Sequence, residues 1–430
     1  MKVSAIVFCR PDGYNLAVAR VGWCGVNRPL TSRERRILAL MSFAALLVCG
    51  ALLLLMVDRI LLTPRASRVV VVSPPDGSLT SERETVSIRA LATGQNLIRS
   101  ELWADGVLVE TITSPEGETM TTWPISHSWM AQGQGRHQFS VKVYDLSGAI
   151  LASSPFAVQV VPPGRIAFAT DRDGNYEIYT MRTDGRQLAR LTSGPEQDRG
   201  PSCSSAGLLL FASTAIGAGT DIWVTDPGSQ ERMNLTASVG GDRSPRWAPD
   251  DEMIAFVSDR YGPSQVYLMH PDGSGPFQLT AQDSPVEQPS WAPDGSALLY
   301  AAERDGNWDV FSISVDEGTV ERLTEDPAQD WYPAWSPRGD QIAFASGRQG
   351  IQQIYSMKAD GTEPRRLTAF PSGAEQPQWS PDGGWIVFVA YMGRSKGLQA
   401  REIYIMRSDG SDPIRLTDNA FDDTGPVWCQ

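Results

Sequence analysis

The chain has 430 residues and a net charge of −13, and 41% of its residues are hydrophobic. This length predicts two or three domains, and the composition excludes a largely disordered chain. The charge is uneven, because residues 1–68 carry ten Lys and Arg against three Asp and Glu, a balance of +7 that leaves −20 for the rest. Such an acidic exterior excludes nucleic acid as an expected partner, since phosphate binding needs clustered basic side chains. Its simplest role is solubility.

The N-terminal region predicts a membrane anchor. Residues 1–36 show no clear periodicity and are interpreted as a short cytoplasmic tail that ends in basic residues. The uncharged residues 37–57 form a run long enough to cross a bilayer as a helix. Seven Lys and Arg precede this run and three follow it closely, which predicts an N-terminus inside the cell and a periplasmic or extracellular remainder. A cleaved signal peptide is the alternative, but no small-residue cleavage site follows the run. We therefore expect a single-pass transmembrane helix.

Residues 66–162 predict a separate β-sandwich. Short apolar stretches alternate with polar residues at 86–90 and 139–144, and Asp105-Gly106 is typical of a hairpin turn. About seven short strands fit into this segment. The segment also resembles bacterial immunoglobulin-like domains, through an opening Pro-x-x-Gly, the Trp-Ala-Asp-Gly hairpin and a late Val-Tyr-Asp-x-x-Gly. Such modules usually space or present other domains.

Residues 163–430 repeat one pattern six times. A Leu-Thr pair recurs with steps of 44, 44, 44, 44 and 49 residues, beginning at Leu191 and ending at Leu416. Tryptophans recur with steps of 44, 44, 44 and 49, at Trp247, Trp291, Trp335, Trp379 and Trp428. Periods of this length, with apolar runs separated by Asp-Gly and Pro-Asp turns, indicate four-stranded propeller blades. Each Trp is expected at the end of a blade's first strand, as a wedge between neighbouring blades.

The ends of the repeat region predict how the ring closes. At 164–166 the region starts with the pattern of a blade's second strand, without the first-strand pattern before it. Residues 425–430 show the missing first-strand pattern. We therefore expect these last residues to pair with 165–170 and complete the first of six blades, which leaves no open sheet edge. Deletion of 425–430 should destabilise the ring. The expected fold is all-β: a six-bladed propeller closed by the C-terminal strand, behind an immunoglobulin-like β-sandwich and one transmembrane helix.

The repeats are similar to those of TolB-type propellers. The resemblance rests on Trp-Ser-Pro-Asp-Gly-x-x-Ile-x-Phe, Ile-Tyr-x-Met-x-x-Asp-Gly and Arg-Leu-Thr, and it covers about 270 residues. It implies a six-bladed ring that binds other envelope proteins in the periplasm. The matching residues belong to the scaffold. The predicted anchor and immunoglobulin-like unit also depart from TolB itself, which has a cleaved signal and an α/β domain before the ring.

Two loops alternate oxygen-bearing side chains in a pattern that suits Ca²⁺. The candidate ligands are Asp171, Asp173, Asn175, Glu177, Glu303, Asp305, Asn307 and Asp309. A distant bidentate Glu is missing and the other blades lose the acids, so the simpler interpretation is hairpins held by Asp/Asn–backbone bonds and an Asp–Arg pair. Neither a cofactor nor a bound metal is otherwise expected.

The last blade carries a five-residue insertion, since its step is 49 residues and the others are 44. Loops on a rigid scaffold carry recognition, so the basic stretch from Tyr391 to Arg401 is a candidate partner-binding loop. Its candidate side chains are Tyr391, Arg394, Lys396 and Arg401. Tolerated length variation is the alternative. The loop also contains a Gly-x-Ser-x-Gly pattern around Ser395, but a nucleophile would need a strand-to-helix turn and a downstream His, and none follows position 270.

The two cysteines in the repeats are not expected to form a disulfide. Cys203 occupies the Trp position of its blade, because 247 minus 44 is 203. Cys429 comes one residue after Trp428. Adjacent positions of a strand face opposite sides of the sheet, so the two side chains are expected to point apart.

These observations favour a membrane-anchored, extracytoplasmic binding protein that is not an enzyme. Its propeller is expected to dock a protein or peptide partner of the cell envelope, at the rim or the channel mouth. An external sensor for a small ligand or glycan is the alternative, although residues 1–36 are too short for an output domain. A hydrolase acting at the channel is a third possibility, for which no catalytic residues are identified.

Overall fold

The structure is a computed structural model that describes residues 67–429, except 116–117, 216, 218, 230 and 394–398. Its regular elements in these ranges are all β-strands. No helix among the described residues is long and apolar enough to span a membrane. The predicted tail (1–36) and anchor (37–57) lie outside the described residues.

Residues 68–161 form an all-β unit of eight strands. The strands are β1 (Arg68–Ser73), β2 (Ser78–Ser81), β3 (Thr85–Ala104), β4 (Val107–Thr113), β5 (Met120–Met130), β6 (Gly135–Asp145), β7 (Ile150–Ala152) and β8 (Phe156–Val161). The long strand β3 pairs first with β1 and β5 and then with β4 and β6, and its register shifts near Leu97. Leu97, Leu102 and Phe139 belong to its single buried core. The immunoglobulin-like assignment of this unit stays a prediction.

The Asp-Gly hairpin of this unit is present. Ala104 pairs with Val107, and the two residues between them have φ angles of 52° (Asp105) and 80° (Gly106). Positive φ at both central residues is what a type I′ turn requires, and this turn matches the right-handed twist of the strands. Short-range turn chemistry therefore positions β3 against β4.

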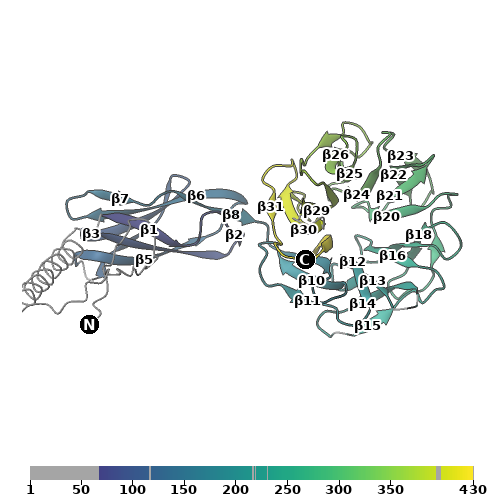
Figure 1. Ribbon diagram of the computed structural model, residues 1–430, viewed down its shortest axis with the longest axis horizontal. Coiled ribbons are helices and arrows are strands. Elements are labelled where there is room, and N and C mark those ends of the chain that lie inside the picture. The colour runs from purple at the N-terminus through teal and green to yellow at the C-terminus, as the bar shows by residue number, and fades with distance from the viewer. Residues whose placement is uncertain are drawn as a thin grey trace, which may run out of the picture. The chain divides into compact units, whose positions relative to one another are not determined.

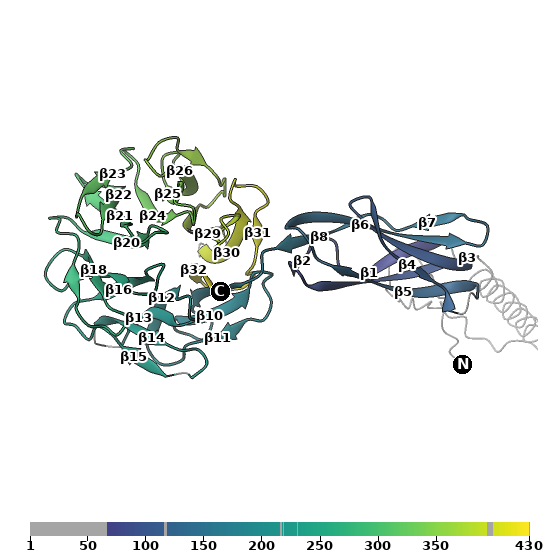
Figure 2. The same cartoon turned by 180° about the vertical axis from the view of Figure 1, so that it is seen from behind.

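Residues 165–429 form six four-stranded antiparallel sheets arranged as a ring (Figures 1 and 2). Blade 1 contains β32 (Asp423–Cys429), β9 (Arg165–Thr170), β10 (Glu177–Arg182) and β11 (Ala189–Arg190). Blade 2 contains β12 (Gln197–Cys203), β13 (Leu209–Thr214), β14 (Thr220–Thr225) and β15 (Arg232–Asn234). Blade 3 contains β16 (Asp242–Trp247), β17 (Ile254–Ser258), β18 (Gln265–Met269) and β19 (Phe277–Gln278).

The remaining blades follow the same order. Blade 4 contains β20 (Val286–Trp291), β21 (Ala297–Arg304), β22 (Asn307–Ser314) and β23 (Val320–Arg322). Blade 5 contains β24 (Asp330–Trp335), β25 (Gln341–Ser346), β26 (Gln353–Lys358) and β27 (Arg365–Arg366). Blade 6 contains β28 (Ala374–Trp379), β29 (Trp385–Gly393), β30 (Gln399–Arg407) and β31 (Ile414–Arg415). The six-bladed propeller expected from the 44-residue period is thus confirmed.

Blade 1 is completed by the C-terminal strand, as the sequence predicts. β32 pairs antiparallel with β9, with Asp423 opposite Thr170 and Cys429 opposite Arg165. The sheet of blade 1 therefore joins the two ends of the repeat region, and β9 does not present an open edge.

The repeated Leu-Thr pair, preceded by Arg in blades 1, 4, 5 and 6, fastens the outer strand of each blade. The hydroxyl of each motif threonine accepts a hydrogen bond from a backbone N–H at the start of the third strand, as Thr192 does from Ile178 at 2.8 Å. The threonines concerned are Thr192, Thr236, Thr280, Thr324, Thr368 and Thr417. In blades 1, 4 and 6 the motif arginine also pairs with a buried carboxylate, as in Arg190–Glu177 at 2.8 Å. The motif is therefore scaffold.

Three of the repeated tryptophans bond to the innermost strand of the preceding blade. The indole N–H of Trp291 donates to the carbonyl of Arg246, that of Trp379 to Ala334, and that of Trp428 to Gln378, at 3.1–3.2 Å. An apolar ring with one polar edge suits this position, because the ring fills the space between blades while its N–H is satisfied.

A disulfide joins Cys203 to Cys429, with their Cα atoms 5.5 Å apart. The expectation from sequence is therefore wrong. The two residues do face opposite sides of their sheets, but they belong to neighbouring blades. Cys203 on β12 faces back toward blade 1, and Cys429 on β32 faces forward toward blade 2, so both point into the same interface between blades. They pack there with Ala167 and Phe211.

Candidate functional site

The innermost strand of every blade contains the same β-bulge. Its pairing register shifts around a proline in all six blades. The residue before each proline has a left-handed backbone. These residues are Gly200 (φ 62°), Ser244 (54°), Gln288 (60°), Tyr332 (54°), Gln376 (57°) and Gly425 (61°). A bulge leaves one residue out of the ladder and redirects its side chain.

Four of these six positions are occupied by residues other than glycine. The left-handed conformation costs such residues about 1–2 kcal/mol, and strain of this kind is often retained near functional sites. All six positions line one cavity at the centre of the ring. The bulge therefore brings one residue from each blade to the central channel, and that residue is a glycine in blades 1 and 2 and Ser, Gln, Tyr and Gln in blades 3 to 6.

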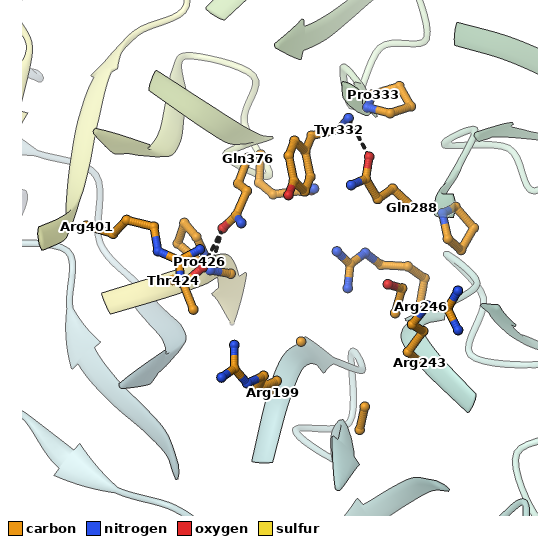
Figure 3. A pocket seen from close by; sticks show the side chains of 16 residues that line it. Arg199, Arg243, Arg246, Gln288, Tyr332, Pro333, Gln376, Arg401, Thr424 and Pro426 are labelled. Atoms are coloured by element: carbon orange, nitrogen blue, oxygen red, sulfur yellow. Dashed lines mark hydrogen bonds between the residues drawn. The ribbon is translucent and has the colours of Figure 1, made fainter. Parts of the chain in front are cut away.

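The central cavity has a volume of about 320 Å³ and is lined by 16 residues from the innermost strands and their neighbours (Figure 3). Its charged lining residues are Arg199, Arg243, Arg246 and Arg401. None of the described lining residues is Asp or Glu. The channel of this acidic protein is therefore locally basic.

Two of the four arginines are neutralised by carboxylates behind the cavity wall. Arg243 binds Glu287, with Nε 3.1 Å from Oε2, and lies 3.7 Å from Asp259. The Nε of Arg401 donates to Asp422 at 2.9 Å. Burial raises the pKa of Asp422, but the hydrogen bonds from Arg401 and Tyr176 outweigh burial, and its pKa is lowered overall. These two guanidinium groups are fixed in place by their partners.

The other two arginines have no carboxylate partner among the described residues. Arg246 donates through Nη1 to the carbonyls of Pro245 at 2.9 Å and Pro201 at 3.4 Å. Burial without an opposing charge lowers its pKa to about 10. The guanidinium carbon of Arg199 lies 3.5 Å above the ring centre of Tyr176, which is a cation–π contact.

A second cavity of about 440 Å³ lies toward the ends of the innermost strands. Its lining includes Trp291, Trp335, Trp379 and Trp428, with prolines of the Pro-Asp-Gly turns. Arg246 lines both cavities. The repeated tryptophans thus line an aromatic opening of the channel, and Arg246 lines both this opening and the basic cavity.

In the first blade, the candidate calcium ligands are engaged with protein groups. Asp171 accepts from the backbone N–H of Asp422 at 2.8 Å, and Asp173 accepts from Tyr179 at 2.6 Å. Asn175 donates to Glu177 at 3.1 Å, and Glu177 is fully buried. Glu177 also carries the ion pair with the motif arginine described above.

In the fourth blade, Glu303 accepts from the backbone N–H of Gly306 at 2.8 Å, across the turn that contains Asp305. Asn307 donates to Asp309 at 3.2 Å, and Asp309 binds Arg322 at 2.6 Å. No group of three or more His, Cys, Asp or Glu side chains arranged to hold a metal ion is found among the described residues.

The structure places two of the four candidate residues of the insertion loop. Tyr391 on β29 is opposite Arg401 on β30, and Arg401 lines the central cavity. Burial and the neighbouring Glu375 raise the pKa of Tyr391. Arg394, Lys396 and Ser395 lie outside the described residues. Of the two described candidates, Arg401 is therefore the one that lines the cavity.

Sequence analysis missed Arg199, Arg243 and Arg246. Their signal is weak but present, because each lies within three residues of the proline that precedes the repeated Trp position. The repeat fixes the proline and the aromatic residue, whereas the positions around the proline change from blade to blade. Residues that vary within an otherwise regular repeat are the ones to examine for function.

Comparison with known proteins agrees with this geometry. Residues 208–301 and 281–428 match the family model of the TolB beta propeller domain. Together these segments span just over half of the chain. The Tol-Pal system protein TolB of Desulfosudis oleivorans is 30% identical over 105 residues, which are 24% of this chain and 24% of that protein. The chain therefore matches about a quarter of this relative's length.

Solved structures with the same fold extend the comparison. TolB from Acinetobacter baumannii aligns with a TM-score of 0.54 at 19% identity, over 69% of this chain and 80% of that chain. Hydrazine synthase from Kuenenia stuttgartiensis aligns with a TM-score of 0.51 at 15% identity, over 62% of this chain and 47% of that chain. At these identities the likeness concerns the fold alone, and the different names show that one fold serves different functions.

Proposed function

This chain belongs to the TolB beta propeller domain family, and from that membership we propose that its propeller docks a protein or peptide partner of the cell envelope. The observation that carries the proposal is the central cavity. Its walls are a regular scaffold, while the residues that the six bulges bring to it differ between blades. Recognition by variable residues on a rigid frame is how propellers and other repeat proteins usually bind partners.

The chemistry of the lining supports binding rather than catalysis. The cavity contains the hydroxyls of Ser244 and Thr424, but neither His nor a carboxylate is among its described lining residues. A hydroxyl nucleophile needs an adjacent general base. The lining therefore favours docking over hydrolysis as the proposed function.

We place the propeller outside the cytoplasm as part of the same proposal. Disulfides persist mainly in oxidising compartments, and Cys203 is bonded to Cys429. The uncharged run at 37–57 and the basic residues before it predict a membrane anchor that leaves the propeller outside the cytoplasm, which agrees with the disulfide. The proposal is thus a single-pass protein whose ring faces the periplasm or the exterior.

Site-specific photo-crosslinking on the full chain in its native envelope tests the docking site. A crosslinking residue replaces Gln288 in the cavity, and the matched control replaces the exposed Arg304 at the end of β21. The proposal expects one protein to be captured from position 288 and not from position 304. Capture of that protein with equal yield from both positions would place the docking site elsewhere.

The captured partner is then purified and titrated against a cavity variant. Tyr332→Gln is the appropriate change, because glutamine already occupies the equivalent left-handed position in blades 4 and 6. Loss of a buried aromatic anchor is expected to weaken binding by roughly tenfold or more. An unchanged affinity, with a folded variant, would argue against docking in the cavity.

A further inference from the structure

The central cavity has more hydrogen-bond donors than the protein itself satisfies. Of its four arginines, Arg243 and Arg401 are held by carboxylates, whereas Arg199 and Arg246 have no such partner among the described residues. Protein cavities lined by cations and lacking anions repel further positive charge and attract negative charge. The positive lining contrasts with the chain as a whole, which is acidic.

Arg246 is the strongest part of the argument. A guanidinium carries five N–H donors, and the bonds found for Arg246 use only Nη1, toward the carbonyls of Pro245 and Pro201. Neutral carbonyls do not offset the charge, and a half-buried charge that has lost part of its hydration without gaining a counter-charge is destabilising. In Figure 3 its side chain extends into the central opening. An anion in the cavity would supply the missing counter-charge.

Arg199 is held by an aromatic ring and not by backbone carbonyls, and it too keeps N–H groups available to a ligand. Its guanidinium is stacked on the ring of Tyr176. The hydroxyl of Tyr176 donates to Asp422, which also receives Arg401. This chain of contacts fixes the plane of the guanidinium. Stacking leaves the N–H edges of an arginine available to a ligand.

The amide oxygens of the two bulge glutamines in the lining are engaged by donors of the protein itself. The amide oxygen of Gln288 accepts from the backbone N–H of Tyr332 at 2.7 Å, which fixes the amide orientation and leaves its NH₂ group as the remaining polar end. The amide oxygen of Gln376 accepts from Gly425 N at 2.7 Å and from Thr424 at 2.9 Å. Both amide oxygens are therefore engaged, and the NH₂ group of Gln376 donates to Glu375 at 3.3 Å, so the NH₂ group of Gln288 is the donor that the glutamines offer to a ligand.

We propose that the central cavity binds a small oxyanion-bearing ligand, with phosphate or several carboxylates, between Arg199 and Arg246. The planar guanidinium fork matches carboxylate and phosphate oxygens in two-point contacts. A volume of about 320 Å³ is at the small end of ligand pockets, and this favours a compact anion. The site is additional to partner docking, and a ligand here would lie beside the residues proposed to meet the partner.

Isothermal titration calorimetry on the full chain in detergent tests the site, at constant ionic strength maintained with chloride. The probes are inorganic phosphate, glycerol 3-phosphate and citrate. The structure predicts saturable binding of one anion per chain and a rise in melting temperature with anion concentration. Tightest binding of phosphate indicates the free ion, of glycerol phosphate a phosphate ester, and of citrate a polycarboxylate.

The variants are Arg246→Gln and Arg199→Gln, with Arg304→Gln as the matched control outside the cavity. Each cavity variant should raise the Kd roughly tenfold or more, because a charge-assisted hydrogen bond is lost, and the control should leave it unchanged. Arg199 is exposed, so its variant should fold even if the other does not. The proposal is overturned if no probe gives saturable heat, or if both cavity variants bind like the parent. These outcomes do not depend on any protein partner.

Discussion

Nη2 of Arg260 lies 3.1 Å from both carboxylate oxygens of Asp242. The arrangement recurs two blades later, where Nη2 of Arg348 lies 3.1 Å and 3.4 Å from the oxygens of Asp330. Both carboxylates are fully buried. Each arginine lies in the loop between the second and third strands, and its side chain binds an aspartate on the first strand of the same blade. The arginine of these loops therefore forms a structural ion pair.

Replacing Arg260 by glutamine should be strongly destabilising. The change leaves the carboxylate of Asp242 buried without its counter-charge, and breaking such a pair typically costs about 3–5 kcal/mol. Denaturant unfolding of the variant and of Arg304→Gln measures the difference. A loss in the free energy of unfolding no larger than that of the exposed control would show that Asp242 is accommodated without Arg260.

Replacing Arg246 by glutamine should not destabilise the fold. Burial lowers the pKa of Arg246 to about 10, so the folded state disfavours its charged form. No carboxylate among the described residues loses a partner in this variant. We expect the free energy of unfolding to be unchanged or raised by ~1 kcal/mol. Residues kept for function are often unfavourable for stability, so that replacing them stabilises the fold and impairs activity. A destabilisation comparable to that of Arg260→Gln would contradict the assignment of Arg246 to ligand binding.

Asp422 should make stability depend on acidic pH. Its folded-state pKa is lowered, because hydrogen bonds from Arg401 and Tyr176 outweigh the effect of burial. An acid of this kind stabilises the fold above its unfolded pKa of about 3.9, and the contribution disappears as pH falls through the lower folded value. Asp422→Asn should therefore lose about 1.5–3 kcal/mol at neutral pH.

The measurement is the difference in melting temperature between parent and Asp422→Asn across acidic and neutral pH. The difference should be constant above the unfolded pKa and shrink below it. A difference that stays the same throughout the acidic range would mean that the side chain acts through packing and not through its charge.

The Cys203–Cys429 bridge should stabilise the ring. Native disulfides typically contribute about 2–4 kcal/mol, and this one ties the closing strand to blade 2. The melting temperature should fall by the same amount in Cys203→Ser, Cys429→Ser and the double variant. A reductant should lower the melting temperature of the parent to that of the variants and leave the melting temperatures of the variants unchanged. Unequal effects of the two single variants would indicate that one cysteine acts independently of the bridge.

Much of the fold follows from the sequence because it depends on local, repeated interactions. The Leu-Thr pair recurs since each threonine hydroxyl receives the same backbone N–H, as Thr192 does from Ile178. The strand that closes the ring is visible because 425–429 repeats the first-strand pattern, and its partners from Arg165 to Thr170 are found as expected.

The candidate site was harder to predict because it depends on a departure from regular strand geometry. Simple alternation along a strand places a side chain on one face or the other of a sheet. The bulges break this alternation and turn residues such as Gln288 and Tyr332 into the channel. The same limitation misled the cysteine prediction, since alternation describes one sheet and Cys203 and Cys429 meet between two.

The bridge also changes what happens to the chain if it is cut. Residues 203–429 form a covalent macrocycle once the two sulfurs are joined, since their separation along the chain is 226 residues. A protease that nicks a loop within blades 3 to 6 opens this macrocycle but does not release a fragment. The two pieces stay tethered at high effective concentration and can reassemble the same blades. A ring built in this way can survive breakage of its backbone in an environment that contains proteases.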